Sequence, residues 1–130
     1  MNILKKLFGG QKTTEEVRET KEKGFDKVKY EGVRALRMHQ FDLAAKSLEH
    51  ALQLNAEDLE CRDYLSQAYI SMGDLQKAYE QLQILSEAQT DNVAVLLRMA
   101  DVAYMMENYT AMSEVCDKAL HLDTSNLQTY

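Results

Sequence analysis

The chain has 130 residues, of which 45% are hydrophobic and 28% charged, and this composition predicts one folded domain rather than a disordered segment. The net charge is −6, and seventeen of the 21 acidic residues lie in residues 25–130. A body this acidic repels phosphate backbones, which argues against nucleic acid as a partner. The chain has no proline and five glycines, a composition that favours long helices because these two residue types break them.

The N-terminal region predicts a tail, residues 1–12, followed by a charged helical or flexible segment, residues 13–24. Residues 1–8 place apolar side chains on one helical face beside two lysines. This pattern fits a small membrane-surface anchor, a flexible tail or a segment docked on the protein itself. It lacks the apolar run of a secretory signal, and no stretch is long enough to span a bilayer. Thr13 and Glu16 match a capping box, which predicts a helix start.

From residue 25 onward the sequence repeats with a period of 34 residues. The runs KSLEHALQLNAED, EQLQILSEAQTDN and EVCDKALHLDTSN occupy the same place in successive units. Each run has a helical apolar spacing and ends in a polar turn. The resulting units are 25–58, 59–92 and 93–126. Residues 127–130 resemble the stub of a further helix.

Each unit predicts two short helices joined by a turn. The predicted first helices are 26–38, 59–72 and 93–106, and the second helices are 42–54, 75–88 and 109–122. Gly73 suits the left-handed conformation that closes a helix, and His39 and Glu107 stand in its place in the other units. Each unit ends in a residue type favoured as an N-cap of the next helix. These are Asp58, Asn92 and Asn126.

Residue size follows the same period. Small residues occupy the places where paired helices must approach closely, namely Gly32, Ser66, Ala100, Ala44 and Ala78. The second helices carry an apolar stripe that predicts burial on one side and ends at Leu120 in the third unit. A large apolar residue is expected to plug each turn between helices. These residues are Phe41, Leu75 and Tyr109.

A 34-residue helix–turn–helix unit with these places resembles the tetratricopeptide repeat. The resemblance covers residues 25–126 and implies an all-α fold. It implies a right-handed superhelical array of three repeats, preceded by the N-terminal charged segment. This sequence differs from the family pattern at two kinds of position. The aromatic residue expected early in the first helix is replaced by Val28, Arg62 and Leu96, and the closing proline by Ala56, Thr90 and Thr124. The alternative is a helical bundle with accidental periodicity.

The resemblance implies that the first helices line a concave groove that binds a protein or peptide segment. The family's groove places also include Asp26, Glu60, Leu97 and Met105. The groove residues on which we base the prediction are Lys29, Tyr30, Val33, Arg37, Asp63, Tyr64, Gln67, Arg98, Asp101 and Tyr104. The tyrosines offer amphipathic contact area, and the basic residues can pair with carboxylates on a partner. The alternative is a solvated groove whose tyrosines only pack on neighbouring helices.

Chaperone-binding members of this family hold a C-terminal carboxylate with a clamp of Lys, Asn, Asn, Lys and Arg. The corresponding residues here are Lys29, Val33, Tyr64, Ala94 and Arg98. Two of the five match and both asparagines are lost. The resemblance therefore disfavours a carboxylate clamp in this chain.

Catalytic and cofactor-binding motifs are absent from the sequence. It contains no glycine-rich phosphate loop and no nucleophile elbow, and the three histidines fall in different units without metal-ligand spacing. Cys61 and Cys116 fit no disulfide or metal pattern, which predicts reduced thiols and a cytoplasmic location. The sequence therefore predicts a protein that is not an enzyme and has no cofactor and no metal.

The last second helix suggests a further contact surface. Ala111, Val115 and Leu122 are predicted to face a missing neighbour, which fits truncation of a longer parent, coverage by the N-terminal segment or a homo-oligomer. The leading function is a non-catalytic adaptor that holds a protein or peptide in its groove. The alternatives are a self-assembly module that associates through this end and a membrane-surface scaffold tethered by residues 1–8.

Overall fold

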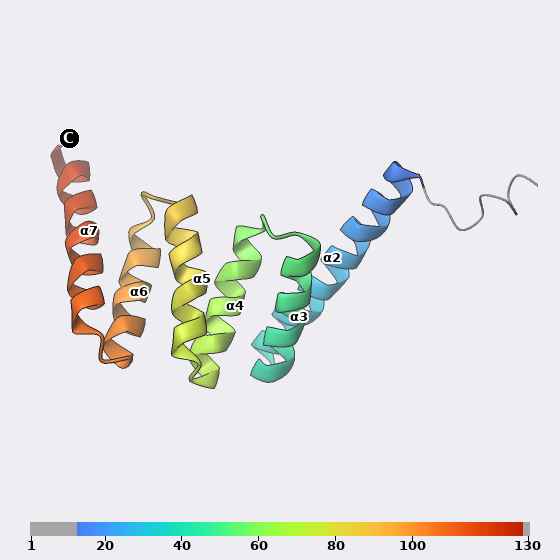
Figure 1. The fold of residues 1–130 in the computed structure, drawn as a ribbon, viewed down its shortest axis with the longest axis horizontal. Coiled ribbons are helices and arrows are strands. Elements are labelled where there is room, and N and C mark those ends of the chain that lie inside the picture. The colour runs from blue at the N-terminus through green and yellow to red at the C-terminus, as the bar shows by residue number, and fades with distance from the viewer. Residues whose placement is uncertain (1–12, 129–130) are drawn as a thin grey trace, which may run out of the picture.

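The computed structural model describes residues 13–128, with side chains through residue 122, and this part of the chain is a row of six helices without a strand (Figure 1). The helices are α2 (Thr14–Arg37), α3 (Phe41–Leu54), α4 (Leu59–Met72), α5 (Leu75–Ala88), α6 (Val93–Met105) and α7 (Tyr109–Gln128). Consecutive helices pack on one another, and α2 also contacts α4. The predicted all-α superhelix of three helix pairs is confirmed.

The predicted charged segment is the first part of α2, which continues without a break into the first repeat. Its start has the predicted capping box, because the Glu16 amide donates to Thr13 Oγ1 at 3.1 Å and the Thr13 amide donates to Glu16 Oε2 at 3.3 Å. Residues 13–23 are exposed, and this part of the helix extends beyond the body in Figure 1. The predicted tail, residues 1–12, lies outside the described residues.

The two helices of the first repeat approach closely at Gly32. A β-carbon at Gly32 would lie 2.7 Å from Cγ and 3.3 Å from the backbone nitrogen of Leu48, which is fully buried. Ser66 takes the corresponding place in the second repeat, where its hydroxyl donates to the Asp63 carbonyl oxygen at 2.7 Å. Ala100 takes it in the third repeat and is buried. The predicted small-residue positions are confirmed, and they allow the paired helices to pack with little space between them.

The turns inside the three repeats share one backbone geometry. His39, Gly73 and Glu107 have φ angles of 60°, 78° and 60°, all in the left-handed region. In each turn the next amide donates to the carbonyl oxygen five residues back at 2.9 Å, which closes the first helix. The period of 34 residues is therefore visible in the backbone as well as in the sequence.

Two of the three predicted N-caps between repeats are confirmed. Asp58 accepts a hydrogen bond from the Cys61 amide at 2.9 Å, and Asn92 accepts one from the Val95 amide at 3.4 Å. The prediction for Asn126 is wrong, because α7 continues through this residue to Gln128. Residues 127 and 128 thus extend α7 rather than begin a further helix. No glycine or proline interrupts this helix, and no following helix within the described residues draws the chain away from it.

Arg62 compensates for the missing aromatic residue and the missing proline in the second repeat. Its Nη2 donates to the Ala56 carbonyl oxygen at 3.0 Å, and its Nη1 donates to Gln81 Oε1 at 2.9 Å. Ala56 stands where the family places the closing proline. The guanidinium therefore connects the linker to α4 and α5 by hydrogen bonds. A proline at residue 56 would instead restrict the linker by fixing its backbone φ angle.

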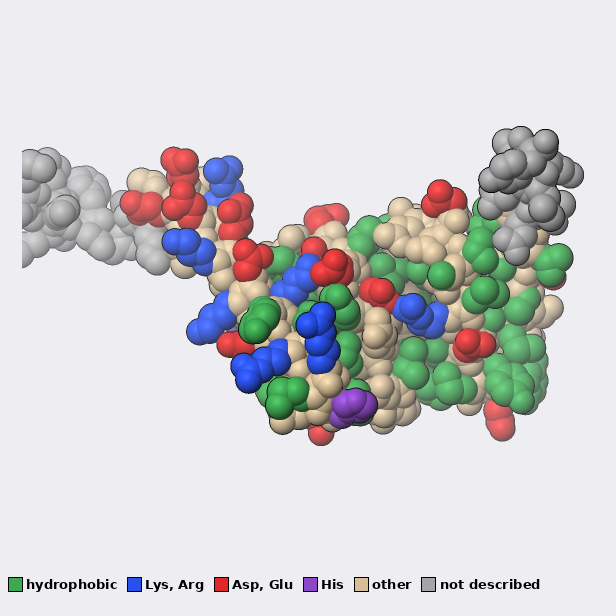
Figure 2. All heavy atoms as spheres, turned by 180° about the vertical axis from the view of Figure 1, so that it is seen from behind, with side chains coloured by type: hydrophobic (Ala, Val, Ile, Leu, Met, Phe, Trp, Pro, Cys, Tyr) green, Lys and Arg blue, Asp and Glu red, His purple; other side chains and the backbone are tan. Residues whose placement is uncertain are grey.

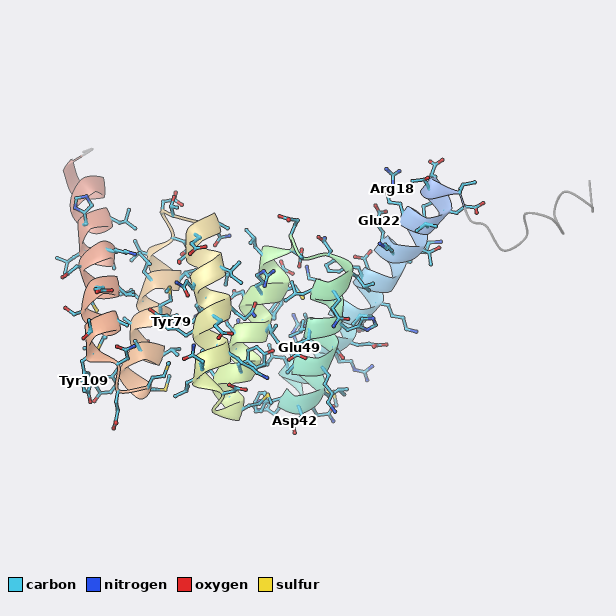
Figure 3. The ribbon with its side chains drawn as sticks, in the orientation of Figure 1. Arg18, Glu22, Asp42, Glu49, Tyr79 and Tyr109 are labelled. Carbon is cyan, nitrogen blue, oxygen red and sulfur yellow. The ribbon has the colours of Figure 1, made fainter. Side chains whose placement is uncertain are left out.

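Polar side chains connect neighbouring repeats around the core. The Tyr69 hydroxyl of α4 donates to the carboxylate of Glu49, a residue of α3 that is labelled in Figure 3. The Lys77 nitrogen of α5 lies 5.7 Å from the centroid of the Tyr69 ring. Burial and the carboxylate of Glu49 both raise the pKa of Tyr69. Burial and the charge of Glu114 on α7 also raise the pKa of Tyr79 on α5.

The C-terminal helix differs from the prediction. Val115 is 5% exposed and Leu122 packs on the core, so neither faces a missing neighbour. The described exposed residues of α7 are mostly polar, and they include Ser113, Glu114, Asp117, Lys118 and His121. Leu120, predicted to be buried, is 66% exposed. Ala111 is half-buried.

Tyr109 does not plug its turn, because 56% of its surface is exposed and its ring meets Tyr104 edge-on at 6.2 Å between centroids. Phe41 and Leu75, at the equivalent places, are half-buried. No further helix pair covers Tyr109 within the described part of the chain.

We expect Gly32→Ala to destabilise the protein and Gly24→Ala to stabilise it. The first change forces a methyl group against buried Leu48, and such overpacking costs about 1–3 kcal/mol. The second meets only Leu54 Cδ1 at 3.8 Å, so the helix propensity of alanine adds about 0.5–1 kcal/mol. Urea unfolding measures both free energies. Equal effects of the two changes would contradict the close approach at Gly32.

We expect Glu107→Gly to raise the free energy of unfolding by about 1 kcal/mol, because a side chain in the left-handed region is strained. Gly73→Ala should lower it by a similar amount. Thermal melts followed by circular dichroism measure both changes. A Glu107→Ala variant is the control, since it keeps the strained backbone and should gain no such stability.

Cys61 should make stability depend on alkaline pH. Its thiol is fully buried and donates to the Leu48 carbonyl oxygen at 3.5 Å. Burial, followed by the negative charge of Asp58, raises the pKa of Cys61 from 9.0 to about 11. The folded state therefore holds this proton more tightly than the unfolded state. The contribution is complete below pH 9 and is lost as the pH rises through about 11.

We therefore expect the free energy of unfolding to fall less steeply between pH 9 and pH 11 in Cys61→Ala than in the wild type. Urea titrations at several pH values measure this slope. Cys116→Ala is the control, because it removes the other free thiol, which is not fully buried. Equal slopes in the wild type and Cys61→Ala would contradict this account.

Candidate functional site

The first helices of the repeats carry a pocket between α2 and α4. Its volume is about 350 Å³, and its lining residues are Asp26, Lys29, Tyr30, Val33, Arg34, Arg37, Glu60 and Tyr64. Five of the ten predicted groove residues line it. Val33 and Tyr64 also pack on the core, which fixes the floor of the pocket, whereas Tyr30 is 68% exposed at its rim.

Lys29 is already bound within the chain. Its Nζ lies 3.0 Å from Asp58 Oδ2, 3.1 Å from Glu60 Oε1 and 5.6 Å from the centroid of the Phe25 ring. Burial alone would lower the pKa of Lys29, but the hydrogen bonds to Asp58 and Glu60 and the negative charges of these residues together outweigh it and raise the pKa. This lysine joins α2 to the start of α4 and remains charged at neutral pH.

Arg98 is also paired within the chain. Its guanidinium on α6 contacts the Asp63 carboxylate on α4. Asp63 and Arg98 were predicted as separate contacts for a partner, and the structure joins them as a bridge between two first helices. Both side chains remain partly exposed, so the pair forms part of the groove surface.

Arg34 and Arg37 are the arginines of the pocket, and both are exposed. Neither makes an ion pair with another residue in the described range 13–128. The prediction included Arg37 and omitted Arg34. Its signal was in the sequence, because Tyr30, Arg34 and Arg37 have the spacing i, i+4 and i+7 and so share one helical face.

The surface changes in character towards α6. Leu97, Tyr104 and Met105 are 51%, 61% and 47% exposed. Asp101 is an exposed acidic residue on the same helix, and Gln67 of α4 is half-buried. Figure 2 shows one face of the molecule, with Lys and Arg side chains gathered towards α2 and hydrophobic side chains more frequent towards the C-terminal helices.

The described residues also form a hollow outside this pocket. This second hollow of about 520 Å³ is lined by residues of α5, α6 and α7 that include Leu96, His121 and Leu122, and no predicted groove residue belongs to it. No group of three or more His, Cys, Asp or Glu side chains in residues 13–128 is arranged to hold a metal ion. None of the described helices is both long enough and apolar enough to cross a membrane.

Solved structures share this arrangement of helices. The Arabidopsis OM64 TPR domain has a TM-score of 0.69 and 18% identity over 80% of this chain and 86% of that chain. PcrH, in complex with the chaperone binding region of PopB, has a TM-score of 0.69 and 13% identity over 80% and 84%. The Sgt2 TPR domain from Aspergillus fumigatus has a TM-score of 0.65 and 20% identity over 77% and 66%. At these identities the likeness shows the fold alone.

No curated protein sequence matches this chain. Residues 35–95 match the tetratricopeptide repeat family, and this range runs from the first repeat into the third. The shared turn geometry and the small residues between paired helices extend the same unit on both sides of the match. Residues 35–95 therefore carry tetratricopeptide repeats, and the described helices on both sides of this range continue the same fold.

Proposed function

We propose that this protein is a non-catalytic adaptor that holds a segment of another protein in the groove formed by α2, α4 and α6. Tetratricopeptide repeats are protein-interaction scaffolds, and this chain has their fold. The observation that carries the proposal is the pocket of about 350 Å³ between α2 and α4, with tyrosine and arginine at its rim. Five of its eight lining residues are charged, whereas small-molecule pockets are lined mainly by apolar side chains, so this pocket suits side chains of an extended or helical segment better than a small metabolite.

The exposed side chains of the groove support this proposal. Tyr30, Leu97 and Tyr104 each leave more than half of their surface in water. Tyrosine and arginine are enriched among the residues that carry most of the binding energy at protein interfaces. Helices already fix the backbone at these positions, so a partner that covers them has to order only their side chains.

The two alternatives have less support. Self-assembly was predicted to use Val115 and Leu122 as exposed contacts, but both side chains pack on the core of the protein. The tether of the membrane-surface scaffold, residues 1–8, lies outside the described residues. A cytoplasmic location belongs to the proposal, and the two free cysteines are consistent with a reducing compartment.

We expect peptides selected on the wild-type protein to depend on Tyr30. The probe is a phage-displayed library of random peptides, and the binding of enriched peptides is measured by fluorescence anisotropy. Tyr30→Ala should weaken binding about tenfold or more, which corresponds to about 1.4 kcal/mol, because it removes an exposed aromatic contact at the pocket rim.

The matched control is Ile84→Ala on α5, which truncates an exposed apolar side chain outside the groove. It should leave binding within about twofold of the wild type, since surface changes away from a site have small effects. Circular dichroism is used to check that both variants keep their helices. Peptides that bind Tyr30→Ala as well as they bind the wild type, or a library without enrichment, would count against the groove.

A further inference from the structure

We infer that the groove recognises internal acidic side chains of its partner over α2 and apolar side chains over α6, without requiring a free C-terminus. This inference rests on the proposed function and names the chemistry of the bound segment. It depends on which charges of the groove are already paired, which are available, and how the surface changes from α2 to α6.

The first step is that two of the predicted cations are committed within the chain. Lys29 lies between two carboxylates, and Arg98 is paired with Asp63. A carboxylate that approached either cation would also meet the acidic groups that hold it. Binding there would require an existing pair to break, which leaves a carboxylate without its partner.

The second step is that Arg34 and Arg37 remain available. Both are exposed at the pocket, on the helical face that they share with Tyr30. A guanidinium binds a carboxylate through two parallel hydrogen bonds, and an adjacent tyrosine adds apolar contact area. Outside the Lys29–Glu60 pair, the pocket lining holds two arginines and one acidic residue, Asp26, so these lining residues carry one net positive charge.

The third step is that the α6 part of the groove does not offer the same chemistry. Its cation, Arg98, is paired, and Asp101 is exposed on the same helix. Leu97, Tyr104 and Met105 present apolar surface there. A carboxylate would therefore be repelled near Asp101, whereas an aliphatic or aromatic side chain would bury surface against these residues. The preferred segment is acidic at one end and apolar at the other.

The fourth step concerns the C-terminus of the partner. A clamp for a terminal carboxylate needs amide donors at the two places that hold Val33 and Tyr64 in this chain. Val33 has no side-chain donor, and the flanking cations Lys29 and Arg98 are paired. Side-chain carboxylates of Asp or Glu can bind Arg34 and Arg37 at any position along a chain.

The test uses fluorescein-labelled peptides with both termini blocked. One half of each peptide carries glutamates and the other half carries leucine and phenylalanine, and both orders are made because either can fit the groove. Control peptides replace the glutamates with lysines or leave the C-terminus free. Fluorescence anisotropy measures Kd for each peptide with the full chain.

We expect one blocked acidic peptide to bind about tenfold or more tightly than its lysine counterpart, with little gain from a free C-terminus. Arg34→Gln with Arg37→Gln should abolish that preference. Arg34→Lys with Arg37→Lys should keep most of it, because the charges remain. The matched control is Lys46→Gln with Lys118→Gln, which removes two exposed positive charges from α3 and α7 and should leave Kd within about twofold.

Arg34 and Arg37 lie in the last turn of α2, so a thermal melt of each variant shows that the helix is intact. Equal binding of acidic and lysine peptides, a preference that survives in the Gln variant, or binding that requires a free C-terminus would overturn the inference. If library peptides that depend on Tyr30 prove to be basic or neutral, the adaptor function stands and this inference fails. If none depends on Tyr30, the adaptor function itself fails.

Discussion

The close contact between the two helices of a repeat is the constraint on which the rest of the structure depends. At Gly32 the backbone of α2 leaves no room for a β-carbon beside Leu48. Ser66 and Ala100 keep the equivalent places small in the other repeats. Paired helices that pack this closely bury a continuous stripe on each second helix, and stacked pairs then bury the remaining apolar faces. The first helices consequently lie beside one another, and their outward faces form one surface.

The residue that joins the first two repeats also sets the charge of that surface. Asp58 caps α4 by accepting a hydrogen bond from the Cys61 amide, and its carboxylate lies 3.0 Å from Lys29 Nζ. The N-cap that begins the second repeat thus neutralises a cation of the groove. Between the second and third repeats, the carboxylate of Asp63 neutralises the guanidinium of Arg98. Because Asp58 and Asp63 pair with Lys29 and Arg98, the positive charges of this surface that have no ion pair within the described residues are those of Arg34 and Arg37.

The period of the sequence was enough to predict the fold, because turn, cap and small-residue positions recur every 34 residues and depend on local geometry. The predicted bounds of α4 and α5 agree with the structure, since each of these helices ends at a turn or a linker with such signals. The errors lie in α7. Whether Asn126 begins a new helix depends on a following helix, and whether Val115 is buried depends on α5 and α6. Neither contact has a local signal.

The groove was harder to predict, because its charges act in pairs between helices. The sequence identified Lys29, Asp63 and Arg98 as groove residues, but their pairing depends on distances between α2, α4 and α6. The net charge of −6 suggests that the protein repels acidic segments. At physiological ionic strength, however, charges more than about 8 Å apart are strongly screened. The proposed preference for an acidic segment therefore depends on the local charges at the end of α2 rather than on the net charge.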